Sequence, residues 1–127
     1  LNIESLTMSG MVRQDIFPAV SGYVAQLAQA VAAKRAVAPG LPCQAECALI
    51  EQLSALLDRA FAQTEELSAL LAGPQAESAN VLTAATHYRD QVIPVMAALR
   101  ATVDQMEQLV SAQCWPYPSY AELMYSI

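Results

Sequence analysis

Apolar and polar residues follow a helical spacing along three stretches of the chain, and the strict two-residue alternation of a half-buried β-strand does not persist anywhere. In the first stretch the apolar positions recur every three or four residues, and Pro18 interrupts the pattern. Lys34 and Arg35 stand where the last turn of a helix favours cations. The pattern therefore predicts a long first helix over about residues 3–35.

The second stretch carries a heptad pattern in which the apolar seam alternates steps of three and four residues. This spacing is typical of helices that pack nearly parallel or antiparallel to one another. The seam consists of Ile50, Leu53, Leu57, Ala60, Thr64, Leu67 and Leu71. Other apolar residues widen it, as expected for a helix with more than one neighbour. We expect this helix over about 45–72, after a loop at 36–44 that contains two prolines and a glycine.

The third stretch predicts a helix over about 75–112, interrupted by Pro94. Gly73 and Pro74 are expected to close the second helix and open the third, because glycine suits a helix end and proline a first turn. The methionines mostly lie on apolar faces and are interpreted as core. The third helix presents one apolar face, formed by Val81, Ala85, Tyr88, Val92, Val95 and Leu99.

The two interrupting prolines have matching surroundings. Segments 13–20 and 89–96 both read Arg, two polar residues, two apolar residues, Pro and two apolar residues. Because proline in a helix interior costs about 3 kcal/mol, two such sites indicate that packing requires the bends. In an up-down-up bundle the first and third helices are parallel, so the two kinks would lie at similar depth. Coincidence in a short chain is the alternative explanation.

Residues 113–127 form a tail of different character, with the only tryptophan and two prolines that exclude a regular helix. We interpret part of this tail as a candidate interaction arm, which packs on its own bundle or docks onto another domain or subunit. The whole chain, 1–127, is expected to be one all-α domain: an elongated up-down-up bundle of three long helices with Pro kinks. The candidate arm consists of Trp115, Pro116, Tyr117, Pro118 and Tyr120.

Composition adds an expectation about partners. Hydrophobic residues make up 55% of the chain and charged residues 14%, whereas soluble domains carry about 25% charged residues. Part of the apolar surface is therefore expected to be covered by a parent protein or by neighbouring subunits. No stretch reaches the roughly 18 uninterrupted apolar residues of a membrane helix. The net charge of −6, with scattered basic residues, argues against nucleic acid as a partner.

Few residues of the chain are candidates for catalysis or for metal binding. His87, the only histidine, is more often structural than catalytic in such a setting. Cys43 and Cys47 supply only half of a zinc site, and the odd number of cysteines, with Cys114, favours free thiols and a cytoplasmic location. Asp104 and Glu107 can face the same way, but such pairs form a solvated helix face more often than an acid–base pair. We predict no catalytic, cofactor-binding or metal-binding residue in this chain.

Four segments carry a resemblance to a known family. Residues 2–8, 15–20, 88–96 with 98–100, and 115–124 are similar, in this order, to parts of the C-terminal region of type III glutamine synthetases. The last segment resembles the ending Trp-Pro-x-Pro-Thr-Tyr-Gly-Asp-Leu, from which this chain departs at Ser119, Ala121 and Glu122. The middle, 36–80, matches only as a helical stretch of suitable length.

The resemblance implies that the chain is a fragment, and the absence of an initiator Met also favours a fragment over the alternative, a processed mature protein. The parent would join ammonia to glutamate with ATP and a divalent metal, Mg or Mn, at sites in an upstream catalytic domain. No catalytic residue is carried onto this sequence, and the fragment alone is not expected to be an enzyme. Because the family forms ring assemblies, the expected partners are the catalytic domain of the same chain and neighbouring subunits of a homo-oligomer.

Two other hypotheses are alternatives to a glutamine synthetase fragment. The chain can be a free-standing helical interaction module that binds a partner helix. It can also be a small bundle enzyme, but such enzymes need ligand sets such as Glu-x-x-His pairs, which the sequence lacks.

Overall fold

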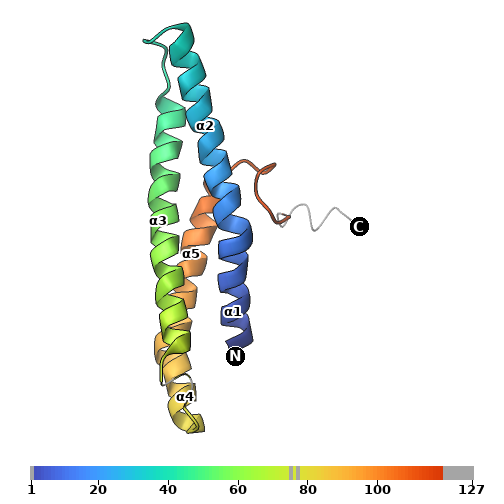
Figure 1. Cartoon of the computed structure of the whole chain (residues 1–127), viewed down its shortest axis with the longest axis vertical. Coiled ribbons are helices and arrows are strands. Elements are labelled where there is room, and N and C mark those ends of the chain that lie inside the picture. The colour runs from blue at the N-terminus through green and yellow to red at the C-terminus, as the bar shows by residue number, and fades with distance from the viewer. Residues whose placement is uncertain (1, 75, 77, 119–127) are drawn as a thin grey trace.

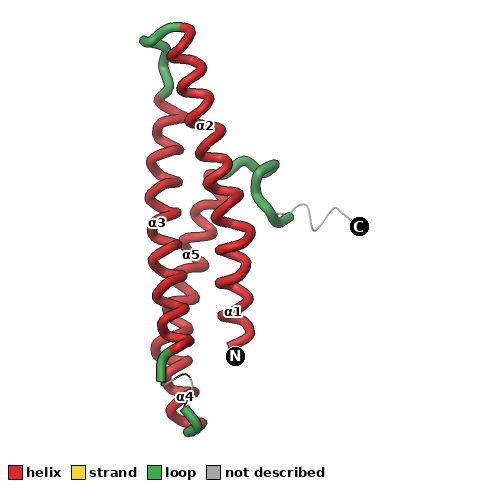
Figure 2. The backbone as a smooth tube through the Cα atoms, viewed as in Figure 1, coloured by secondary structure: helices red, strands yellow, loops and turns green. Residues whose placement is uncertain are grey.

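The computed structural model describes residues 2–74, 76 and 78–118. This part of the chain contains three long helical segments and no strand, so the all-α prediction is confirmed. The segments lie lengthwise beside one another and give an elongated molecule (Figures 1 and 2). The helical elements are α1 (Asn2–Met11), η1 (Val12–Ile16), α2 (Phe17–Val37), α3 (Gln44–Ala72), α4 (Val81–His87), η2 (Tyr88–Val92) and α5 (Ile93–Leu109), where η marks a π-helical turn.

The first segment runs without a break through α1, η1 and α2. Its buried positions include two serines, because small side chains let α1 lie close to its neighbours. The larger apolar residues Leu6 and Met11, which follow the same helical spacing, are exposed. The buried positions are Ser5, Ser9, Val12, Ile16 and Val20.

Each of the two matching proline segments contains one π-helical turn that ends two positions before the proline, at Ile16 and at Val92. The Phe17 N–H donates to the Val12 carbonyl, and the Ile93 N–H donates to the Tyr88 carbonyl. Such a turn bonds each carbonyl to the N–H five residues later. Proline has no N–H to continue the ordinary helical ladder, so a wider turn just before it accommodates the missing donor. The two sequences thus share the same local backbone as well as the same residue pattern.

Helix α3 is the element that both other segments share, since it packs along α2 and along α5. Its buried seam is formed by Leu53, Leu56, Ala60, Thr64 and Leu67. Four of these five belong to the predicted heptad; Leu56 takes the place expected for Leu57, which is half-buried. The Thr64 hydroxyl donates to the Ala60 carbonyl at 2.7 Å, so this polar seam residue is buried with a partner.

The third helical segment begins later than predicted. It starts at Val81 rather than near 75, because the Asn80 side chain accepts hydrogen bonds from the backbone N–H groups of Leu82 and Thr83 and so caps the helix there. Pro74 does not open this helix. It lies in a turn that the Ala76 N–H closes by donating to the Gly73 carbonyl at 3.1 Å.

The same segment also ends earlier than the predicted residue 112. Helix α5 stops at Leu109, and Val110 has an extended backbone. Ser111 then organises a turn: its carbonyl accepts from the N–H groups of Cys114 and Trp115 at 2.9 and 3.1 Å. This turn directs residues 112–118 away from the helix axis, where the tail leaves the side of the bundle (Figure 1).

The lengths of the helices leave part of the molecule only two helices wide. In Figure 1 the chain ascends through α1 and α2 and returns through α3, whereas α5 reaches only part of the way along α3. Beyond its end, α2 and α3 form a hairpin alone. Lys34 bridges the hairpin tip through an ion pair with Glu46. By length and composition alone, the helical segment Glu4–Val37 is also apolar enough to span a membrane, and 17% of its most apolar window is buried inside the structure.

Candidate functional site: a groove beside the C-terminal arm

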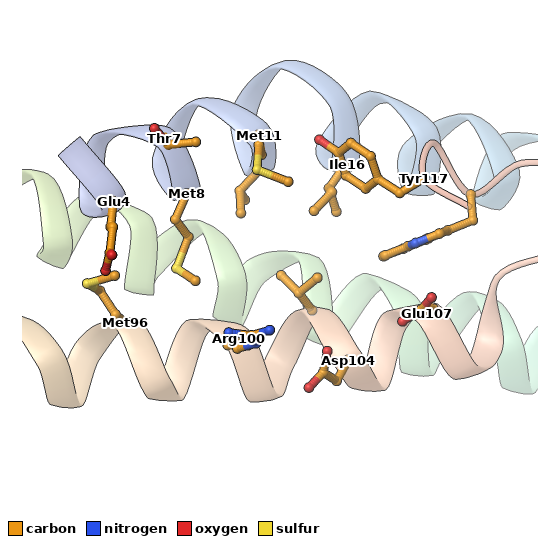
Figure 3. Close-up of a pocket in the computed structure, with 13 residues that line it drawn as sticks. Glu4, Thr7, Met8, Met11, Ile16, Met96, Arg100, Asp104, Glu107 and Tyr117 are labelled. Carbon is orange, nitrogen blue, oxygen red and sulfur yellow. The ribbon is translucent and has the colours of Figure 1, made fainter. Parts of the chain in front are cut away.

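A cavity of about 700 Å³ opens between the first and third helical segments. One wall comes from α1 and η1, the other from α5, and the tail closes part of it. Figure 3 shows α1 and α5 facing each other across this space, with α3 behind. We call it the α1–α5 groove. Its lining consists of Glu4, Thr7, Met8, Met11, Val12, Ile16, Met96, Arg100, Val103, Asp104, Glu107, Trp115 and Tyr117.

The groove exists because α1 and α5 both pack on α3 but make few close approaches to each other. Near the start of α1 a side-chain hydrogen bond links the two helices, since the Ser5 hydroxyl donates to the sulfur of Met96 at 2.9 Å. The Tyr88 hydroxyl also donates to this sulfur, at 3.8 Å. Met96 is thereby held at one end of the groove, while the tail lies beside the other.

The methionines divide between the core and the groove. Met8 and Met96 pack against the buried core, as predicted, although they also line the groove, and Met124 lies outside the described residues. Met106 is fully buried, as expected of a core residue. Met8 and Met96 are half-buried and Met11 is exposed, and all three line the groove. Their helical spacing indicated an apolar face correctly, but the structure leaves that face open because no fourth element covers it in the described part of the chain.

The candidate arm packs onto the bundle through its aromatic residues. Trp115 and Tyr117 are half-buried and contact the core, whereas Pro116 and Pro118 are exposed. The Tyr117 hydroxyl donates to the carboxylate of Asp15 in η1. Its burial, the hydrogen bond and the negative charge of Asp15 together raise the pKa of Tyr117 to about 12. Tyr120, the fifth residue of the predicted arm, lies outside the described residues.

The charged residues that line the groove are exposed or half-buried. Asp104 and Glu107, the acidic pair noted in the sequence, both line it, and so do Glu4 and Arg100 (Figure 3). None of these four forms an ion pair with a described residue. Among the described residues no three of His, Cys, Asp and Glu gather as they would around a metal ion.

His87 has a structural contact outside the groove. Its Nε2 lies 2.9 Å from the carbonyl oxygen of Leu70 and, in the tautomer that carries the proton there, donates to it. Leu70 belongs to the last turn of α3, whose carbonyls have no partner within the helix. The histidine therefore ties α4 to the end of α3, a role that its position in the sequence did not reveal.

The three cysteines are free thiols in three different places. Cys43 is buried directly before α3, where its sulfur lies 3.6 Å from the Leu41 carbonyl. Cys47 is half-buried one turn later in α3, and Cys114 is half-buried in the tail near α2, with its sulfur 4.0 Å from Gln26 Oε1. The structure does not bring Cys114 or His87 to the pair Cys43 and Cys47.

The geometry defines a helical bundle with an open groove and an aromatic arm, and the comparisons relate it to one enzyme. A glutamine synthetase of Butyrivibrio fibrisolvens is 28% identical over 130 residues, a match that covers 100% of this chain and 18% of that protein. The resemblance to a glutamine synthetase is thereby confirmed, while the type III assignment stays a prediction. The chain spans less than a fifth of the relative's length. No family model matches the chain, and no solved structure matches it.

Proposed function

We propose that this chain is the non-catalytic, helical C-terminal domain of a type III glutamine synthetase. The observation that carries the proposal is the match of the whole chain to a small part of a glutamine synthetase. In the parent enzyme, ATP and a divalent metal, Mg or Mn, would serve the ligation of ammonia to glutamate in a separate catalytic domain. The domain described here would be cytoplasmic, without contact to nucleic acid or membrane.

The role that fits the structure is to support the assembly of a homo-oligomer or to buttress the catalytic domain of the same chain. Two features support this role: the apolar groove between α1 and α5, and the aromatic residues of the arm, which lie at its margin. The wide exposure of apolar residues along the first helical segment, such as Leu6 and Val37, agrees with a surface that other parts of the protein cover.

The first test is genetic and biochemical. The reading frame upstream of Leu1 should encode a large catalytic domain, and the full protein should form glutamine from glutamate, ammonia and ATP with Mg or Mn. The isolated chain should show no such activity. A complete gene that starts next to Leu1 would instead favour the free-standing interaction module, the alternative that the open groove supports.

The second test concerns the arm in the full-length enzyme. Trp115→Ala should loosen the oligomer or lower its melting temperature, because truncating a fully buried tryptophan costs about 3–5 kcal/mol and a half-buried ring roughly half of that. Phe61→Ala is the comparison variant, since it removes an aromatic ring outside the groove that is 56% exposed and has the ring of Phe17 6.4 Å away; it should cost less stability than Trp115→Ala. Equal oligomer mass and equal melting temperature for Trp115→Ala and the unmodified enzyme would contradict the proposed role of the arm.

A further inference from the structure

The α1–α5 groove has the length of a short helix. On one wall its lining runs from Glu4 to Ile16, and on the other from Met96 to Glu107. At a rise of 1.5 Å per residue, each wall is about 17 Å long, which corresponds to about three turns. The walls are themselves two helices resting on α3 (Figure 3). A helix laid between them would contact α1 on one side and α5 on the other, with Trp115 and Tyr117 of the tail at one end.

The surface of the groove is chemically suited to an apolar helix face. Met8, Met11 and Met96 offer unbranched, flexible side chains that adapt to the residues placed against them. Val103 and Trp115 add a branched and an aromatic surface. Grooves of this kind bind amphipathic helices, whose apolar residues recur at steps of three and four.

The charged residues that line the groove indicate which charges a bound helix should carry beside its apolar face. Three of the four charged residues that line the groove are acidic, namely Glu4, Asp104 and Glu107, and only Arg100 is basic. Since none of them pairs with a described residue, their charge is available to a ligand. Opposite charges across an interface select the partner and speed its approach.

From this shape and charge we infer that the α1–α5 groove binds an amphipathic helix of about three turns that carries Lys or Arg on both sides of its apolar stripe. A second copy of this chain is the weaker candidate, because it contains 12 acidic residues against 6 basic ones and would be repelled by the acidic residues that line the groove. The inference goes beyond the proposed function, since it concerns the isolated chain and holds whether or not the parent is a synthetase.

The test uses a synthetic peptide of about 14 residues with Leu at helical positions i, i+3, i+7 and i+10 and with Lys beside them. A second peptide has Glu in place of every Lys. Trp115 reports binding by fluorescence, because it is the only tryptophan and lines the groove. Methyl-labelled methionines report the location by NMR. We expect the Lys peptide to bind in a saturable one-to-one manner and to shift Met8, Met11 and Met96, while the buried Met106 is unaffected.

A pair of double variants tests the charge argument. Asp104→Lys with Glu107→Lys should weaken binding of the Lys peptide about ten-fold, as expected for two exposed charge contacts, and should improve binding of the Glu peptide. Glu51→Lys with Asp58→Lys is the matched control, because it makes the same charge change at exposed positions of α3 that do not line the groove. This control should bind both peptides as the unmodified chain does.

Several results would overturn the inference, and two of them need no variant. The first is equal binding of the Lys and Glu peptides to the unmodified chain, and the second is binding of neither. Equal weakening by the two double variants would show attraction to the overall charge only. A shift of Met8, Met11 and Met96 with protein concentration alone, together with a dimer in sedimentation, would assign the groove to a second copy.

Discussion

Two buried serines on α1 have different surroundings. The Ser5 hydroxyl donates to the sulfur of Met96, whereas the Ser9 hydroxyl has no hydrogen-bond partner among the described residues. A buried polar group without a partner costs about 1–3 kcal/mol, and alanine is also the better helix former. Ser9→Ala should therefore raise the free energy of unfolding by about 1 kcal/mol, as measured by urea denaturation.

The neighbouring serine provides the control for this prediction. Ser5→Ala is one turn away and equally small, but it removes a hydroxyl that has a partner. It should bring no comparable gain in the free energy of unfolding. A loss of stability in Ser9→Ala would mean that its hydroxyl has a partner after all.

Tyr117 should make the stability of the chain depend on pH in the alkaline range. Its pKa is about 12 in the folded chain and about 10 in an unfolded one, so the folded state binds its proton more tightly. The resulting stabilisation is complete below about pH 10 and is lost as the pH rises from about 10 to 12. Denaturation measured through this range should show a steeper loss of stability for the unmodified chain than for Tyr117→Phe, which cannot titrate. Parallel pH profiles would show that the Tyr117–Asp15 contact is absent in solution.

The first turn of α4 is stabilised by the side chain of Asn80. Asn80→Ala should cost about 1 kcal/mol by removing the acceptor for the N–H groups of Leu82 and Thr83. Since α4 has no buried residue, the loss should be local and should appear as faster amide exchange at Leu82 and Thr83. Asn80→Asp keeps the acceptor and should preserve the slow exchange. Unchanged exchange in Asn80→Ala would contradict the cap.

The sequence was sufficient to predict the helices but not all of their ends. Heptad spacing identified the α3 seam, because residues such as Leu53, Ala60 and Leu67 must face a neighbour at every turn. The predicted start of the third segment is wrong because Pro74 is a favourable first-turn residue by sequence, whereas in the structure the side chain of Asn80 caps the helix six residues later. The π-helical turns could not be predicted from the sequence, although the repeated residue pattern around Pro18 and Pro94 coincides with them.

The residues that contribute most to the stability of the whole molecule should lie where α3 packs against its neighbours. Leu99 on α5 is fully buried, whereas Leu6 on α1 is 61% exposed. Leu99→Ala should lower the free energy of unfolding by about 3 kcal/mol, and Leu6→Ala by less than about 0.5 kcal/mol. Chemical denaturation of the isolated chain measures both. Comparable losses in the two variants would show that the first segment is covered on its outer side as well.

The groove could not be predicted from the sequence for a physical reason. Helical periodicity shows that Met8, Met11 and Met96 lie on apolar faces, but it does not fix the lateral distance between α1 and α5. That distance depends on how closely both helices pack on α3. Ser5 and Ser9 are buried, but a search for apolar residues does not identify serines as core positions. The candidate arm can be singled out in the sequence, because two prolines and the only tryptophan follow the last helical pattern.

The packing of α3 against both other segments has a consequence for how the chain folds. Helix α3 packs against α2, which precedes it, and against α5, which follows it, while α1 and α5 scarcely meet. The native contacts therefore belong mainly to two helical hairpins that share one helix, and each hairpin joins segments adjacent in the sequence. Chains with such local contacts close short loops first and fold quickly. Either hairpin can form before the other, and formation of α3 is the step that both routes have in common.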